Sequence, residues 1–217
     1  MALSPNSQNK KTLGLVQVAL FTAIIFVLAM VPGLGYIPLG VIRATTIHIP
    51  VIVGSIVLGP KQGAVLGGIF GLTSFINNTI TPTVTSFVFS PILAMEMMGP
   101  KGAVMSLVIC FLPRILIGIV PYYVYGGIRK VMKNGKNSLV TALGAAGVAG
   151  SMTNTLLVMN LIYLLFGKEY AAAKDMAYEA LYSAILVIIG TNGVPEAIVA
   201  AVLVAAIGQV FKKSKMF

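Results

Sequence analysis

Six long runs of apolar residues divide the chain, and short polar or basic segments separate them. A helix that crosses a bilayer needs about 20 apolar residues, because each residue rises about 1.5 Å through a hydrocarbon core of about 30 Å. Only helices and closed barrels keep all backbone polar groups bonded inside lipid. The pattern predicts an all-α membrane protein, a single six-helix domain over residues 1–217, with spans at roughly 13–31, 45–59, 62–77, 103–128, 138–166 and 180–211.

The second and third predicted spans, 45–59 and 62–77, are short. With about 15 residues each they rise about 23 Å, so we expect both to end below the outer surface. The outer segments 32–44 and 78–102 are the available material to fill the space beside them. Irregular backbone at membrane depth is tolerated where it lines a cavity or is buried in protein. The lengths therefore predict a polar pocket near the outer side, roofed by these two loops.

Composition and charge agree with a membrane protein. The chain is 58% hydrophobic and only 9% charged, with a mean hydropathy of +0.97, whereas soluble domains carry about 25% charged residues. The net charge of +10 does not indicate a nucleic-acid partner, because the basic residues cluster between the apolar runs. Ten lie on one side of the predicted spans and four on the other. This asymmetry predicts that both termini lie in the cytoplasm and that the protein crosses the plasma membrane several times.

Several polar side chains fall at membrane depth, where they are expensive and usually face a bundle interior or a wet cavity. Arg114, Asn154 and Asn192 are predicted at similar depth, Glu196 shares a helix face with Asn192, and Asn160 lies nearer the outer end. One interpretation is a ligand site with Arg114 as the anion receptor and the amides as orienting groups. The other is a structural Arg114–Glu196 ion pair, with the amides bonding between helices.

Two further residues lie where the first outer loop enters the second span. Arg43 either closes over an anionic ligand or extends to lipid phosphates. His48 has no Cys, Asp or Glu close in sequence, so we expect a structural hydrogen-bonding residue and no metal ligand. The chain also lacks a Walker A motif and an obvious nucleophile with a base. It is therefore predicted to hold a small molecule without being an enzyme and without a cofactor of its own.

These features together resemble a known family. Six spans, a basic N-terminus, the alanines Ala19 and Ala23 four residues apart, and the run "NGVPE" in the last span are similar to the substrate-binding S components of energy-coupling factor (ECF) vitamin transporters. The resemblance covers essentially the whole chain. Within the family, "GYIPLGVIRATTIHIPVIVGSIVLGPKQGAVLGGIFGLTSFINNT" is most similar to the pantothenate-type S component.

The resemblance implies a vitamin-binding subunit of an ABC-type importer. Its partners would be a transmembrane coupling (T) subunit and two ATPase subunits, and only the ATPases would use ATP and Mg²⁺. Ala19 and Ala23 would contact the coupling subunit. The vitamin would bind at the outer end, with Arg114 or Arg43 meeting the carboxylate of pantothenate. The remaining polar groups of pantothenate would be met by Asn78, Asn154, Asn160 and Asn192, with Glu196 also at the site.

The stretch "INNTITPTVT" (76–85) would then be a polar lid whose side chains bond to the ligand and to the lid's own backbone. Alternatively, its Asn and Thr residues satisfy turn geometry around Pro82 and Pro91. Other vitamins remain open as ligands, namely folate, riboflavin or a pyridoxine-like compound. A proton-driven secondary carrier is a further alternative, for which only Glu196 is placed to titrate.

Overall fold

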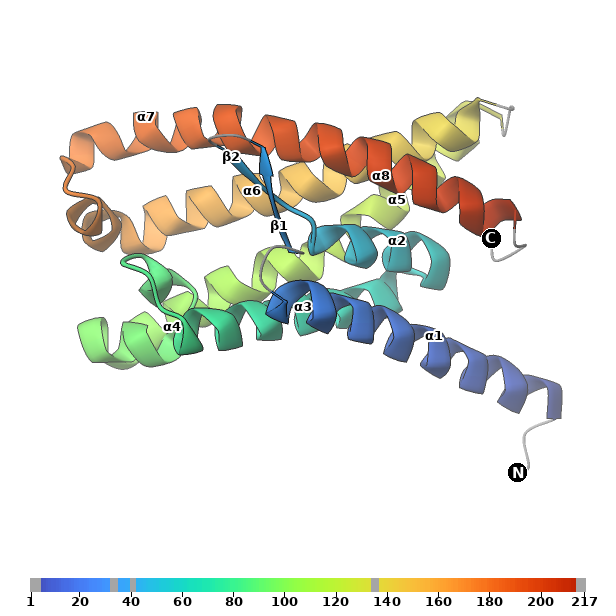
Figure 1. The fold of residues 1–217 in the computed structure, drawn as a ribbon, viewed down its shortest axis with the longest axis horizontal. Helices are drawn as coiled ribbons and strands as arrows, with labels where there is room; N and C mark the ends of the chain where they lie inside the picture. The colour runs from blue at the N-terminus through green and yellow to red at the C-terminus, as the bar shows by residue number, and fades with distance from the viewer. Residues whose placement is uncertain (1–4, 32–34, 40–41, 134–136, 214–217) are drawn as a thin grey trace.

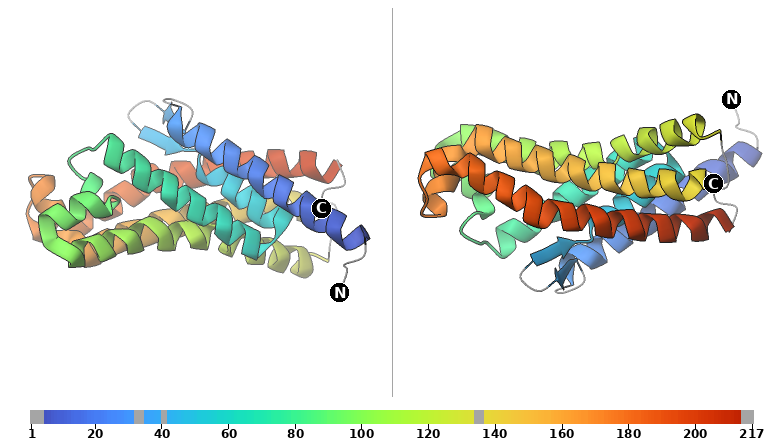
Figure 2. Two further views of the ribbon diagram at one scale, coloured as in Figure 1. Left: turned by 90° about the horizontal axis from the view of Figure 1, so that it is seen from below. Right: turned by 90° about the horizontal axis from the view of Figure 1, so that it is seen from above.

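The computed structural model describes residues 5–31, 35–39, 42–133 and 137–213. Figure 1 shows long helices that follow one common axis, and Figure 2 places the first and last described residues at the same end of the bundle. In the described residues, five helical segments are apolar and long enough to cross a membrane, and a sixth apolar helix is shorter. All six predicted apolar segments are thus helical, and five of them are long enough to span a membrane.

The helices build these six spans in chain order. α4 and α5 form one long segment, as do α7, η2 and α8, where η1 is a short 3₁₀ turn and η2 a π-helical turn. The bounds are α1 Pro5–Met30, α2 His48–Leu58, α3 Pro60–Ile80, η1 Ser86–Val88, α4 Pro91–Ile117, α5 Val120–Val131, α6 Ser138–Ala173, α7 Tyr178–Ile188, η2 Ile189–Gly193 and α8 Val194–Lys213.

Only one of the two helices expected to be short is short. α2 has 11 residues and rises about 16 Å, as predicted, but α3 has 21 residues and is long enough to span a membrane. The polar residues at its end extend the helix. Asn78 Nδ2 donates to the Ser74 carbonyl at 2.9 Å and Thr79 Oγ1 to the Phe75 carbonyl at 2.9 Å. Such bonds to the preceding turn satisfy these side chains within the helix.

The outer segment 78–102 is also more helical than predicted. α4 already begins at Pro91, where Ser90 Oγ caps the helix by accepting from the Leu93 N–H at 3.4 Å, and a proline at the first helical position needs no N–H partner. At Gly99 the backbone turns sharply, with φ 68° and ψ −160°, a conformation that glycine adopts without steric cost. Apart from this turn at Gly99, the non-α-helical part of the segment is therefore residues 81–90, which include η1.

The first outer segment adds a feature that an all-α prediction does not contain. β1 (Tyr36–Leu39) and β2 (Ile42–Thr45) form an antiparallel hairpin in which Pro38 lies opposite Arg43. Figure 2 shows the hairpin at the side of the bundle, and β2 contacts η2 and α8. Its aromatic and β-branched residues favour an extended chain. The described part of the segment is thus a folded hairpin beside the last span.

The last span is interrupted at "NGVPE", where a continuous helix was predicted. Pro195 has no N–H and cannot bond to the carbonyl four residues earlier, and the turn before it is the π-helix η2. At Gly193, an added Cβ would lie 2.8 Å from the Thr155 side chain of α6. The absence of a side chain at Gly193 therefore allows the last span to pack closely against α6.

Two clusters of buried apolar residues form the core. The first centres on α1, α2 and α3 and contains Ile47 and Phe70. The second centres on η1, α4, α6 and α7 and has Phe89 packed against it. These three residues also border one polar cavity. The candidate site therefore lies between the two clusters.

A polar cavity around Arg114

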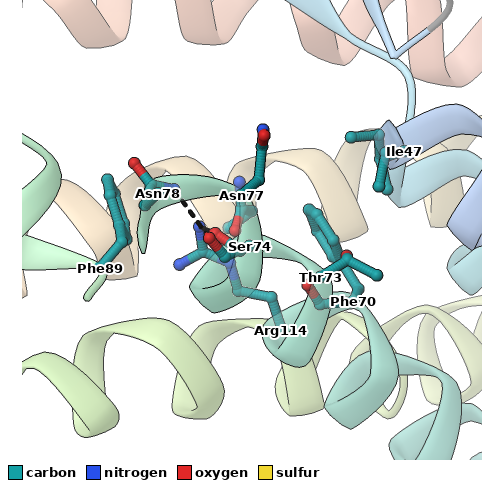
Figure 3. A pocket seen from close by; sticks show the side chains of 10 residues that line it. Ile47, Phe70, Thr73, Ser74, Asn77, Asn78, Phe89 and Arg114 are labelled. Atoms are coloured by element: carbon teal, nitrogen blue, oxygen red, sulfur yellow. Dashed lines mark hydrogen bonds between the residues drawn. The ribbon is translucent and has the colours of Figure 1, made fainter. Parts of the chain in front are cut away.

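The cavity has a volume of about 210 Å³ and is enclosed by five elements of the bundle and the loop after α3. Its wall combines amides and hydroxyls with a few apolar side chains, as small-molecule sites do. Figure 3 shows the α3 side chains gathered above the guanidinium of Arg114. The described lining residues are Ala29, Ile47, Phe70, Thr73, Ser74, Asn77, Asn78, Phe89, Arg114 and Asn154.

Arg114 is the charged residue of this wall, and its side chain is 6% exposed. Its Nη1 donates to the Ile109 carbonyl at 2.8 Å, and its Nη2 lies 3.5 Å from Ser74 Oγ. The Phe89 ring lies 4.9 Å and the Phe70 ring 5.6 Å from the guanidinium carbon. Two aromatic faces attract a cation and also exclude water from it. The guanidinium is therefore held in one place at the cavity.

The charge of the cavity favours an anionic ligand. None of the described residues that line it is a carboxylate, and the whole sequence contains only five Asp and Glu residues. A cation beside a poorly hydrated space interacts more strongly with an anion than it would in water. An Arg side chain also matches the planar geometry of a carboxylate, to which it can donate two parallel hydrogen bonds.

Asn78 reaches the cavity but also holds the loop above it. Its Nδ2 bonds to the Ser74 carbonyl, and its Oδ1 accepts from Ser86 Oγ at 2.8 Å. Ser86 Oγ accepts in turn from the Thr83 N–H at 2.9 Å, and the hydroxyls of Thr79 and Ser90 lie 2.7 Å apart. Many of the polar side chains at 78–90 therefore bond to this segment itself, which agrees with the turn-geometry alternative; a bond to the ligand stays a prediction.

The position of Arg114 depends on a close approach between α3 and α4. A Cβ added at Gly67 would collide with the Arg114 carbonyl oxygen. We expect Gly67→Ala to lower the midpoint of thermal unfolding by several degrees, because overpacking costs about 1–3 kcal/mol. Gly68→Ala is the matched control, since an added Cβ there meets nothing within 4 Å. Equal midpoints for the two variants would contradict this account of the helix contact.

The structure brings together three of the residues proposed for the ligand. Arg114, Asn78 and Asn154 lie on the cavity wall, whereas Asn160 and Glu196 are not among the residues described there. Asn160 Nδ2 donates at 2.7 Å to Leu156 of its own helix. The shared depth of Arg114 and Asn154 was thus a useful guide, and contact of Asn160 and Glu196 with a ligand stays a prediction.

The remaining predicted residues lie elsewhere. Asn192 belongs to η2, outside the described cavity wall, where its Oδ1 lies 3.4 Å from Thr191 Oγ1. The side chain of Arg43 lies outside the described part of the chain, so its role stays a prediction. Ala19 and Ala23 are both exposed on α1, away from the cavity. Their exposure leaves the face free for a contact in the membrane.

Sequence reasoning missed most of the α3 wall, although the signal was present. Phe70, Thr73, Ser74, Asn77 and Asn78 follow one another at intervals of three, one, three and one. This spacing places them on one face of a helix. The segment was divided instead between a short span and a loop, so the polar stripe was not recognised as a single helix face.

Most of this chain is similar in sequence to known proteins. The family model described as "ECF transporter, substrate-specific component" matches residues 14–208. The pantothenic acid transporter PanT of Lactococcus lactis subsp. cremoris is 39% identical over 175 residues, which cover 80% of each chain. The pantothenate transporter PanT of Leuconostoc mesenteroides is 31% identical over 208 residues, which cover 93% of each chain.

Proposed function

Because the chain belongs to the family of substrate-specific components of ECF transporters, we propose that it is the membrane subunit that binds pantothenate for such an importer. The observation that carries the ligand assignment is the buried Arg114 in a small cavity walled by amides and hydroxyls, in a chain similar to two pantothenate transporters. The protein is a multi-pass protein of the plasma membrane.

Pantothenate matches this cavity in chemical terms. It carries one carboxylate, two hydroxyls and one amide. The Arg114 guanidinium pairs with the carboxylate in a charge-assisted contact. Thr73, Ser74, Asn77 and Asn154 offer hydrogen-bonding groups for the hydroxyls and the amide. Phe70 and Phe89 shield the ion pair from water, which strengthens it.

In the membrane, both termini lie in the cytoplasm and the cavity lies toward the outside. The excess of basic residues on the side of the termini supports this orientation. The cavity is bordered by Ala29, near the end of α1, and by Phe89, in the loop between α3 and α4. α1 runs from the end that holds the described termini toward the other end, so both positions lie away from the termini, which supports entry of the ligand from outside.

Transport requires partners. The chain binds the vitamin but performs no chemistry, and it associates with a T subunit and two ATPase subunits that use ATP and Mg²⁺. Family membership supports this division of labour. The α1 face with Ala19 and Ala23 contacts the T subunit, because exposed small residues four apart allow a second helix to approach closely.

A thermal-unfolding screen of the purified chain against B vitamins tests the ligand. A ligand that binds only the folded state raises the unfolding midpoint, and saturation at about 100 times Kd adds about 2.7 kcal/mol of stability. We expect stabilisation by pantothenate and no shift with folate, riboflavin or pyridoxine. Stabilisation by one of these three alone would assign a different vitamin to the same cavity.

Vesicles that contain only this chain test its dependence on partners. We expect them to bind radiolabelled pantothenate without accumulating it against a gradient, whether or not a proton gradient is applied. Vesicles that also contain the T and ATPase subunits should accumulate it when ATP is supplied. Accumulation by the chain alone would contradict the assignment and would favour a secondary carrier.

A further inference from the structure

Two buried polar side chains and one buried amide oxygen lie near the cavity. His48 is 2% exposed and Ser151 is 1% exposed, and Asn154 Oδ1 is buried although Asn154 lines the cavity. Neither nitrogen of His48, nor Ser151 Oγ, nor Asn154 Oδ1 has a hydrogen-bond partner among the protein atoms described. Buried polar groups are nearly always hydrogen-bonded, because leaving one unpaired costs free energy. These three groups therefore need a shared explanation.

Helix packing brings these groups to the same level of the bundle. α2 contacts α6. A Cβ added at Gly150 of α6 would lie 2.5 Å from the Ile52 side chain of α2. His48 lies one turn from Ile52, and Asn154 lies one turn from Gly150 on the corresponding side, since residues four apart share a helix face.

The position of the cavity shows in which direction along α2 and α6 these one-turn steps run. Ile47, next to His48, lines the cavity together with Asn154, so the step from Ile52 to His48 and the step from Gly150 to Asn154 both lead toward it. Ser151 lies three residues before Asn154 and therefore close to it on α6. One turn to either side, Gly147 packs against Ala200 of α8 and Thr155 against Gly193, so Ser151 faces α8, which α2 also contacts. The imidazole and the amide oxygen thus lie at the same level on α2 and α6, and the hydroxyl lies beside the amide toward α8.

We propose that His48 is a positioning residue for the ligand, which holds the Asn154 amide in one orientation through an ordered water shared with Ser151. A buried water typically makes about three hydrogen bonds, and three groups without a protein partner lie at this level of the bundle. A neutral imidazole supplies one donor and one acceptor, and the hydroxyl supplies both. This inference rests on the proposed function, because it concerns the same cavity.

The consequence concerns which ligand groups the cavity accepts. When Asn154 Oδ1 is held on the side of His48, the amide Nδ2 faces the cavity and donates hydrogen bonds. The wall then offers a donor as well as the Arg114 cation, and it selects a ligand with a second acceptor oxygen, such as an amide carbonyl. In this arrangement His48 acts as a hydrogen-bonding group.

The test measures the Kd of pantothenate by calorimetry for purified variants. We expect His48→Leu to weaken binding about three- to tenfold, the effect of one lost hydrogen bond. His48→Gln keeps an N–H donor and should stay within about twofold of the wild type. Ser55→Ala is the matched control, because Ser55 Oγ is also buried without a protein partner but its side chain packs toward Gly63 of α3.

A double-mutant cycle with Asn154→Ala shows whether His48 acts through Asn154. In the Asn154→Ala background, His48→Leu should change the Kd by less than about twofold, because the group that it positions is gone. An unchanged Kd for His48→Leu, or an undiminished effect in that background, would overturn the inference. If His48→Leu does not fold, as judged by size-exclusion chromatography and thermal unfolding, the same cycle with Ser151→Ala decides. Failure of the wild type to bind pantothenate would instead overturn the proposed function.

Discussion

Replacing Arg114 by alanine is expected to weaken pantothenate binding by about 100-fold or more, as measured by calorimetry on the purified protein. Truncating one partner of a buried charge pair costs about 2–5 kcal/mol, since the other charge is left without compensation. Arg114 is 6% exposed and lies between Phe70 and Phe89. Water therefore cannot replace the guanidinium beside the carboxylate of the ligand.

Two controls separate this contact from a general loss of structure. Arg129→Ala should leave affinity unchanged, because Arg129 lies outside the cavity wall, near the start of α6, where its Nη1 is 3.4 Å from Ser138 Oγ. Pantothenol, in which a hydroxyl group replaces the carboxylate, should bind weakly to the wild type. It should bind equally weakly to Arg114→Ala, because the group that Arg114 recognises is already missing. Discrimination between pantothenate and pantothenol that survives in Arg114→Ala would contradict the assigned role.

Replacing Ala19 or Ala23 by tryptophan is expected to abolish ATP-dependent uptake by the complete transporter while leaving pantothenate binding by the isolated chain intact. Both alanines are exposed on α1, whose span is only 11% buried within the chain. A large ring on this face prevents the close approach that small residues permit. Uptake into vesicles that contain the T and ATPase subunits measures the first effect, and calorimetry measures the second.

The matched control places the same ring on another lipid-facing helix. Val202 of α8 is 62% exposed, so Val202→Trp adds similar bulk to the membrane surface at a residue of another helix. Uptake by this variant should remain close to that of the wild type. If Ala19→Trp and Ala23→Trp both transport normally, the T subunit does not contact this face of α1.

The membrane segments were predictable because five of them are long apolar runs and the sixth is a shorter one, and length and hydropathy are robust signals. The ends of helices that lie in polar sequence were not predictable. α3 continues through Asn77, Asn78 and Thr79, although these residues favour turns, because their side chains bond within the helix or across to the following loop. Residues before Gly99 were predicted as loop and are helical, since a proline start and a serine cap stabilise a helix that hydropathy alone does not indicate.

The charged residue of the candidate site was predictable from the sequence, but most of the residues around it were not. A single Arg inside a span is rare and costly, so Arg114 was recognised from sequence alone. Asn154 was predicted as well, because it lies at a similar depth to Arg114. Depth does not give the direction in which a side chain points, however, and the described cavity wall does not include Asn160, Asn192 or Glu196. The aromatic rings beside Arg114 come from α3 and the following loop, and pairing them requires the tertiary fold.

The most direct test of the central claim is an experimental structure of this protein with pantothenate bound. We expect ligand density in the cavity among α1, α2, α3, α4 and α6, with the carboxylate within hydrogen-bonding distance of the Arg114 guanidinium. Density for the ligand at another place, or in this cavity with the carboxylate turned away from Arg114, would contradict this claim.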